Sequence, residues 1–225
     1  MTTAMTVPGK LNVGPGGKLT GPAVIRYNNP FPTVNGTPGG GSSQMMGLVM
    51  HTEVGYEAGT IATFNDPAKQ VSAFFSIGAD GAIHQYGPIG VNWEAWAQAA
   101  GNPDWYSIED SDNTHPSVPL TDAQVTAFAQ ILECLSAFAG FPLQITDSVH
   151  VKGLGWHGMG GVPWGNHPNC PGDVRKAQRP TIIALANEIR AGVQPPPPAI
   201  EGIVVQLPAG QSRKVLSHDS GKTWA

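Results

Sequence analysis

The sequence has little charge and few cysteines. Only 12% of its 225 residues are charged, and 12 Lys and Arg against 16 Asp and Glu give a formal net charge of −4. Because there is no basic stripe to neutralise a phosphate backbone, no nucleic-acid partner is expected. Hydrophobic residues make up 40% of the chain, more than a disordered protein carries. Two cysteines, Cys134 and Cys170, are too few for a disulfide-based scaffold.

Long hydrophobic runs are also absent. No stretch approaches the roughly 20 apolar residues that span a bilayer. The first ten residues lack the apolar segment of a signal peptide. The sequence therefore predicts no membrane partner and synthesis in the cytoplasm.

Glycine and proline, in contrast, are abundant, with 29 and 21 residues. Their distribution predicts many loops and four parts: an extended N-terminal arm (1–20), a main domain (21–194), a stiff proline linker (195–198) and a tail (199–225). The tail is expected to form a short β-hairpin with one Asp-box-like turn, from Ser217 to Trp224.

Local patterns predict the elements of the main domain. We expect strands at 48–50 and 106–108, a hairpin of 71–77 and 82–86, helices at 59–65, 92–100, 121–139 and 180–190, and loops at 28–43 and 153–165. The clearest helix begins at Thr121, because Thr121 and Gln124 can form a capping box. Cys134 falls inside this helix with no companion ligand, which predicts a cysteine packed in the core.

Three histidines and one cysteine stand where the pattern is irregular. His51 follows an apolar strand, whereas His157, His167 and Cys170 lie in or just after a Gly-rich stretch. Zinc favours imidazole and thiolate ligands, and a hydrolytic zinc site needs three protein ligands and one open position. His51, His157 and Cys170 would supply such a set.

Several segments carry a family resemblance through their order and spacing. They are Met50-His51-Thr52, Val71-Ser72-Ala73-Phe74-Phe75 with Asp80 to Gln85, Ser107-Ile108-Glu109, and His157-Gly158-Met159-Gly160-Gly161 leading to Asn169-Cys170-Pro171-Gly172. Together they resemble the zinc-dependent N-acetylmuramoyl-L-alanine amidases, which include phage endolysins and are related to peptidoglycan recognition proteins. The resemblance runs from about Met45 to Gly192. It implies an α+β fold, with a central mixed β-sheet flanked by helices.

The resemblance also implies roles for single residues. His51, His157 and Cys170 would bind Zn²⁺, and Glu109 would act as general acid and base, with Asp110 and Asp112 as adjacent rivals. The chain departs from the family pattern at two places. Some members have a tyrosine where this chain has Ala73-Phe74, which leaves only the Ser72 hydroxyl nearby. Some members have Lys or Thr two residues before the cysteine, where this chain has Pro168, so His167 is the expected substitute for stabilising the oxyanion.

The substrate implied by the resemblance is bacterial peptidoglycan, cut at the amide between N-acetylmuramic acid and L-alanine. Aromatic faces stack on sugar rings, and Trp156, Trp164 and Trp93 are therefore candidates for substrate binding, whereas Trp96 and Trp105 are expected in the core. The protein is expected to be a monomer. The absence of a signal peptide fits an endolysin that accumulates in the host cytoplasm and then reaches the cell wall.

Two other functions stay open from the sequence. One is a non-catalytic peptidoglycan-binding module, although members of the wider family that only bind tend to lack the cysteine ligand. The other is a thiol-dependent wall hydrolase with Cys170 as nucleophile and His157 or His167 as base. A helix N-terminus near Cys170 would favour this second alternative by lowering the pKa of the thiol.

Overall fold

The computed structural model describes residues 8–28, 31–90, 92–115 and 117–192. The predicted linker and tail, at 195–198 and 199–225, lie outside these residues, and that part of the domain division stays a prediction. Among the described residues, no helix is both long and apolar enough to cross a membrane.

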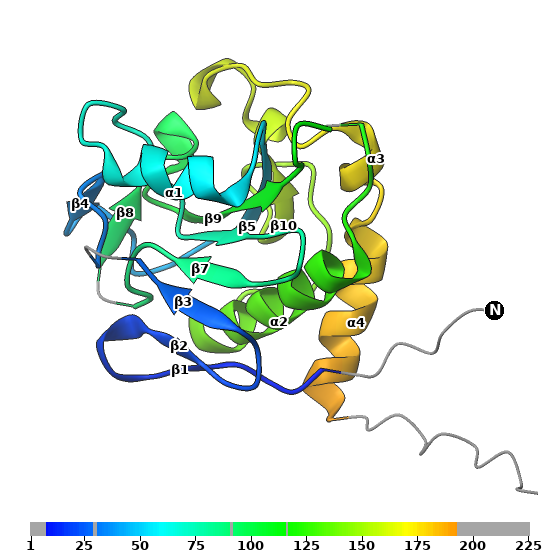
Figure 1. Ribbon diagram of the computed structural model, residues 1–225. Helices are drawn as coiled ribbons and strands as arrows, with labels where there is room; N and C mark the ends of the chain where they lie inside the picture. Colours follow the sequence, from blue (N-terminus) through cyan, green and yellow to red (C-terminus); the bar gives the residue numbers. More distant parts are fainter. Residues whose placement is uncertain (1–7, 29–30, 91, 116, 193–225) are drawn as a thin grey trace, which may run out of the picture. The chain divides into compact units, whose positions relative to one another are not determined.

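A six-stranded mixed sheet lies at the centre of the fold (Figure 1). Its order is β10 (Gly153–Trp156), β5 (Gly47–Glu53), β9 (Trp105–Ser111), β6 (Phe75–Ile77), β7 (Ile83–Gln85) and β3 (Ile25–Tyr27). The first four strands are parallel, β7 is antiparallel to β6, and β3 is parallel to β7. The expected α+β class, with a central mixed sheet flanked by helices, is confirmed.

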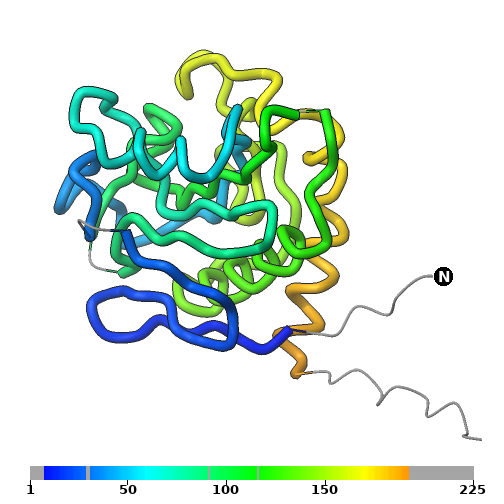
Figure 2. Tube along the Cα trace, in the orientation of Figure 1, coloured from blue at the N-terminus to red at the C-terminus, as the bar shows by residue number. Residues whose placement is uncertain are grey.

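Four α-helices accompany the sheet in the described residues. They are α1 (Glu57–Asn65), α2 (Asp122–Ala139), α3 (Asp173–Lys176) and α4 (Arg179–Ala191). The longest, α2, packs on α4 and on the sheet, and the tube view shows the two helices side by side (Figure 2). The predicted capping box is present, since Thr121 accepts from the Gln124 backbone N–H and Gln124 accepts from that of Thr121.

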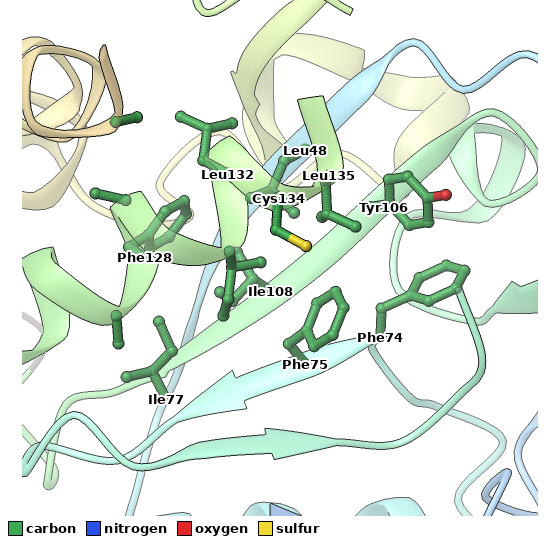
Figure 3. Packing of buried hydrophobic residues seen from close by; sticks show 14 of the residues in the cluster. Leu48, Phe74, Phe75, Ile77, Tyr106, Ile108, Phe128, Leu132, Cys134 and Leu135 are labelled. Atoms are coloured by element: carbon green, nitrogen blue, oxygen red, sulfur yellow. The ribbon is translucent and has the colours of Figure 1, made fainter. Parts of the chain in front are cut away.

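The main core fills the space between α2 and one face of the sheet (Figure 3). Leu48 and Met50 of β5 and Ile108 of β9 are fully buried there. Cys134 lies among these side chains with a free thiol, as predicted. Its large hydrophobic neighbours each stabilise the fold by about 1.5–3 kcal/mol when fully buried. Because α2 covers this face of the sheet, the polar side chains of β5 and β9 are expected on the opposite face.

The predicted extended arm is wrong for its described part. Residues 12–20 form a two-stranded hairpin, β1 (Asn12–Val13) and β2 (Leu19–Thr20), joined by η1 (Pro15–Gly17). The side chains of Leu11 and Leu19 are buried in the main core. Gly17, at φ +70°, lies so close to the Ile89 backbone that a Cβ would clash with it. The glycines that indicated an arm are thus used for close packing.

Two further predictions are wrong in type. Where a helix is expected at 92–100, the structure has the strand β8 (Trp93–Ala95) followed by η2 (Ala99–Gly101). The strand β8 pairs with β4 (Gly36–Pro38), which lies inside the expected loop 28–43. The buried ring of Trp93 packs against Phe74, which outweighs local helix propensity. The expected loop 153–165 begins with the edge strand β10 and continues as η3 (His157–Gly160) and η4 (Val162–Trp164).

Candidate metal centre

Strand register places polar side chains in a row on the face of the sheet away from α2. His51 of β5 lies opposite Glu109 of β9, which in turn lies opposite Ser76 of β6. Side chains alternate between the two faces of a strand. Because Met50 and Ile108 point into the core beneath α2, His51 and Glu109 share the opposite face. The His51 Nδ1 atom lies 3.7 Å from Glu109 Oε1.

His157 and Cys170 join this row from the neighbouring edge of the sheet. His157 follows β10, the strand that pairs with β5, and its ring centroid is 4.3 Å from that of His51. Cys170 enters the cluster from a turn in which its own backbone N–H donates to the His167 carbonyl at 3.1 Å. One ligand atom from each of His51, His157 and Cys170 lies within 4.8 Å of the others. The structure thus brings together the three residues expected to bind metal.

Both imidazoles of this cluster are held in the neutral form. Burial, together with the nearby His157, lowers the pKa of His51 well below its ordinary value. Burial also lowers the pKa of His157 to about 4. Neutral imidazole is the form that binds a metal ion. Each ring uses its Nε2 atom for an internal contact, with Gln98 Oε1 at 3.1 Å from His51 and the Trp164 carbonyl at 2.9 Å from His157.

Cys170 is a half-buried free thiol. Burial, followed by the charge of Glu109, raises its pKa to about 12, and a hydrogen bond from the Thr52 backbone acts in the opposite direction. The expected helix effect is weak here, because α3 begins three residues later and is only four residues long. A metal ion would compensate for the cost of ionising this thiol.

A cavity of about 610 Å³ opens over the cluster. Its walls are formed by His51, Thr52, Val54, Val71, Ala97, Glu109, His157, Asn166, His167, Pro168, Asn169, Cys170, Pro171 and Gly172. His167 is exposed at this cavity, with its ring centroid 4.5 Å from that of His157. The three ligand candidates therefore face a space that can admit water and a substrate.

Glu109 has the environment of a proton-transfer group. Burial raises the pKa of its carboxyl to about 8, with a smaller effect from Glu57. Its Oε2 atom is buried and has no hydrogen-bond partner. The two rivals have other contacts: Asp110 pairs with Arg175 in the core, and Asp112 accepts backbone N–H groups of Gly55 and Thr114. Of the three carboxylates, only Glu109 lines the cavity.

The tryptophans expected to bind substrate do not line this cavity. Trp93 is 4% exposed and belongs to the main core. Trp164 is 5% exposed and packs edge-on against Trp105, one of the two tryptophans expected in the core. Trp156 is half-buried, with its indole N–H bonded to Asp147 and its ring beneath the Lys176 ammonium group. The three rings thus contact other groups of the protein away from the cavity, and a role in substrate binding stays a prediction.

The remaining polar candidates lie apart from the cluster. His84 is buried against Arg26 and lies 3.8 Å from Glu57, and the exposed His115 and His150 do not line the cavity. Ser72 is buried and does not line the cavity, so its hydroxyl does not take the place of the missing tyrosine. Gln98 is a neighbour of the cluster that the sequence did not indicate, because its segment has the pattern of a helix.

The donor set fits zinc. Two neutral imidazoles and one cysteine form a set that hydrolytic zinc sites use, leaving a fourth position for water. Here the cavity lies beside the cluster, and Glu109, whose Oε1 is 3.7 Å from His51 Nδ1, forms part of its wall. The fold and the cluster therefore define a candidate metal-dependent hydrolase.

Comparisons with known proteins identify the family. The family model described as N-acetylmuramoyl-L-alanine amidase matches residues 41–173, more than half of the chain. N-acetylmuramoyl-L-alanine amidase A of Achromobacter lyticus is 34% identical over 135 residues, which cover 52% of this chain and 72% of that protein. The chain belongs to the N-acetylmuramoyl-L-alanine amidases, enzymes that hydrolyse peptidoglycan.

Solved structures agree with this assignment at the level of the fold. The hydrolase AmiA of Staphylococcus aureus, solved with its ligand, has a TM-score of 0.56 at 14% identity, covering 76% of this chain and 86% of AmiA. A selenomethionine derivative of AmpD has a TM-score of 0.51 at 20% identity, covering 72% of this chain and 94% of AmpD.

Proposed function

We propose that this amidase is zinc-dependent, with His51, His157 and Cys170 as the ligands of Zn²⁺ and Glu109 as the catalytic acid and base. The observation that carries the proposal is the cluster itself. Its three ligand atoms lie within 4.8 Å of one another, and Glu109 Oε1 lies 3.7 Å from His51 Nδ1, one of the candidate ligand atoms. The bond cleaved is the amide between the lactyl group of N-acetylmuramic acid and L-alanine in peptidoglycan.

Bound zinc would supply Lewis acidity, which lowers the pKa of water and polarises a carbonyl group. The Glu109 carboxylate, which lines the cavity, takes the proton of the attacking water and returns it to the nitrogen of the leaving alanine. Burial raises the pKa of Glu109. A nearby cation favours the ionised form of a carboxyl. Bound zinc would therefore lower this pKa again and favour the carboxylate, the form that acts as a base.

His167 is placed to stabilise the negative charge that develops on the carbonyl oxygen. It is exposed at the cavity beside His157, and its ring can donate a hydrogen bond to that oxygen. Pro168 has no side-chain donor, so the neighbouring His167 takes the place of the Lys or Thr seen in other members.

The two alternative functions are less well supported. A module that only binds peptidoglycan has no need of a carboxylate with one unpartnered oxygen beside three ligand groups. A thiol nucleophile must be ionised to react, but burial raises the pKa of Cys170 to about 12.

A peptidoglycan digestion assay distinguishes the zinc amidase from the binding module and the thiol hydrolase. Purified walls are incubated with the protein, with the protein treated with a chelator, and with the treated protein to which zinc is returned. We expect turbidity to fall, the loss to stop on chelation and return with zinc, and new N-terminal alanine to appear. Reducing sugar ends in place of N-terminal alanine, or activity that survives chelation, would contradict the proposal.

The two cysteines provide matched variants for the same assay. Cys170→Ser should lose zinc and activity, whereas Cys134→Ser, a change of the same kind in the core, should keep both. Glu109→Gln should keep zinc and lose turnover by about 10²–10⁴-fold, the usual contribution of a general acid or base. Equal loss in both cysteine variants would point to damage to the fold instead of a ligand role.

We also propose that the chain is a phage endolysin that accumulates in the host cytoplasm as a monomer. The support is the resemblance of His157 to Gly161 to lysins of phages that infect actinobacteria. Expression inside a bacterium with sensitive walls should cause lysis only when the membrane is permeabilised. Lysis without permeabilisation would contradict this proposal and leave the amidase activity unaffected.

A further inference from the structure

The two nitrogens of His51 face different surroundings. Nε2 lies 3.1 Å from Gln98 Oε1, whereas Nδ1 lies on the side of Glu109, the wall of the cavity. In a neutral imidazole one nitrogen carries the proton and only the other has a free lone pair. Metal binding at the cluster therefore depends on which tautomer His51 adopts.

The side-chain amide of Gln98 is held in one orientation. Its Nε2 donates to the carbonyl of Trp105 at 3.1 Å and to that of Gly101 at 3.4 Å. Carbonyl oxygens only accept hydrogen bonds, so the amide cannot turn without placing its own oxygen against both of them. Gln98 is 1% exposed, which leaves no water to compensate for such a turn. Gln98 Oε1 must therefore face His51.

The backbone around Gln98 is fixed as well. The backbone N–H groups of Ala97 and Gln98 both donate to Asn102 Oδ1, at 3.0 and 2.6 Å. These bonds close a short loop around η2, and Ala97 of this loop lines the cavity. The acceptor that Gln98 presents is thus part of a rigid, buried element rather than a mobile side chain.

We propose that Gln98 is a positioning residue that holds His51 as the Nε2–H tautomer and so presents its Nδ1 lone pair to the metal. The amide oxygen can only accept, and the Nε2 of His51 must donate. The inference rests on the proposed metal site, but it concerns a state of the metal-free protein that can be observed by itself. His157 obtains the same state from the backbone carbonyl of Trp164, which no side-chain substitution removes.

The tautomer can be read directly from long-range ¹H–¹⁵N correlations of the histidine rings in the metal-free protein at neutral pH. We expect His51 to be in the Nε2–H form in the wild-type protein. In Gln98→Met, which keeps the length of the side chain but removes the acceptor, we expect a mixture of tautomers or the Nδ1–H form directed at Glu109. His157 should stay in the Nε2–H form in both proteins and serves as an internal reference.

Zinc affinity, measured by competition with a chromophoric chelator, gives a second readout. Removing a side chain that is hydrogen-bonded to a metal ligand typically weakens metal binding by about 10- to 100-fold. We expect zinc affinity to fall by this factor in Gln98→Met. Asn102→Ala is the matched control, because it removes two backbone hydrogen bonds of the same loop but not the bonds to the Trp105 and Gly101 carbonyls that orient the Gln98 amide. It should keep the His51 tautomer, and a change as large as that in Gln98→Met would assign the effect to the loop and overturn the role of the Gln98 acceptor.

The results separate this inference from the proposed function. An Nδ1–H form of His51 in the wild-type protein would overturn the role of Gln98 whether or not any variant folds. An unchanged tautomer and zinc affinity in folded Gln98→Met would also overturn it. If the wild-type protein showed the Nε2–H form but bound no zinc, the metal site would be wrong and the action of Gln98 on the His51 tautomer would stand.

Discussion

Arg175 is a buried cation in α3, the short helix that follows Cys170. Its guanidinium is 1% exposed and forms an ion pair with the fully buried Asp110 carboxylate. It also donates to Thr52 Oγ1 at 2.8 Å and to the Val118 carbonyl at 3.1 Å. One side chain of α3 thus joins the ends of β5 and β9, the strands that carry His51 and Glu109.

Replacing Arg175 with Met should destabilise the protein strongly. The variant leaves the Asp110 carboxylate buried without a partner, and breaking a buried pair in this way costs about 3–5 kcal/mol. With a urea m-value of about 2 kcal/mol/M, the midpoint of unfolding should fall by about 1.5–2.5 M. In the double variant Arg175→Met/Asp110→Leu no charge is left unpaired, so most of this loss should be recovered.

Urea unfolding followed by circular dichroism tests this reasoning. Lys176→Met is the matched control in the same helix, because Lys176 forms an exposed pair with Asp173 and should cost at most about 1 kcal/mol. The reasoning is refuted if Arg175→Met costs no more than Lys176→Met. It is also refuted if the double variant is less stable than Arg175→Met alone, since the buried charge would then not be the cause.

Three other changes follow from the structure. His167→Ala should lower kcat by about ten-fold or more while zinc stays bound, and unchanged turnover would remove His167 from the mechanism. Trp93→Ala should cost about 3–5 kcal/mol by leaving a cavity in the core; a wild-type urea midpoint would contradict its place there. The pKa of Glu109 is raised from 4.5 to about 8, so its contribution to stability is complete below pH 4.5 and is lost as the pH rises through 8. Metal-free wild-type protein should therefore lose more stability than metal-free Glu109→Gln between pH 5 and 8, and parallel pH profiles of the urea midpoint would count against the shift.

The parts of the fold that could be predicted from sequence are those with a local cause. The capping box at Thr121 depends on a few neighbouring residues and is present as expected. The hairpin around Asp80-Gly81 is also present, with shorter strands than expected, at Phe75–Ile77 and Ile83–Gln85. The candidate ligands could be proposed because His51, His157 and Cys170 belong to short segments whose order resembles a known family. Their proximity in space agrees with that proposal.

The parts that could not be predicted depend on distant partners. Trp93 has the local pattern of a helix but lies in a strand, because its ring packs on Phe74 and its strand pairs with β4. The conformation of Gln98 depends on the carbonyl groups of Trp105 and Gly101, which local periodicity does not reveal. Aromatic residues near a site look alike in sequence whether they bind sugar or fill the core, and Trp164 is buried.

The candidate metal centre differs from a structural zinc site in what holds the residues that could bind the ion. In small zinc domains the metal organises the chain, and the apo form is unfolded. Here His51 is fixed by a paired central strand and by Gln98, and His157 by β10 and the Trp164 carbonyl. The core beneath α2 contains none of the ligand candidates. The geometry of the candidate centre therefore comes from the fold. In the proposed zinc site the ion would have only to ionise Cys170, whose pKa is raised to about 12, first of all by burial.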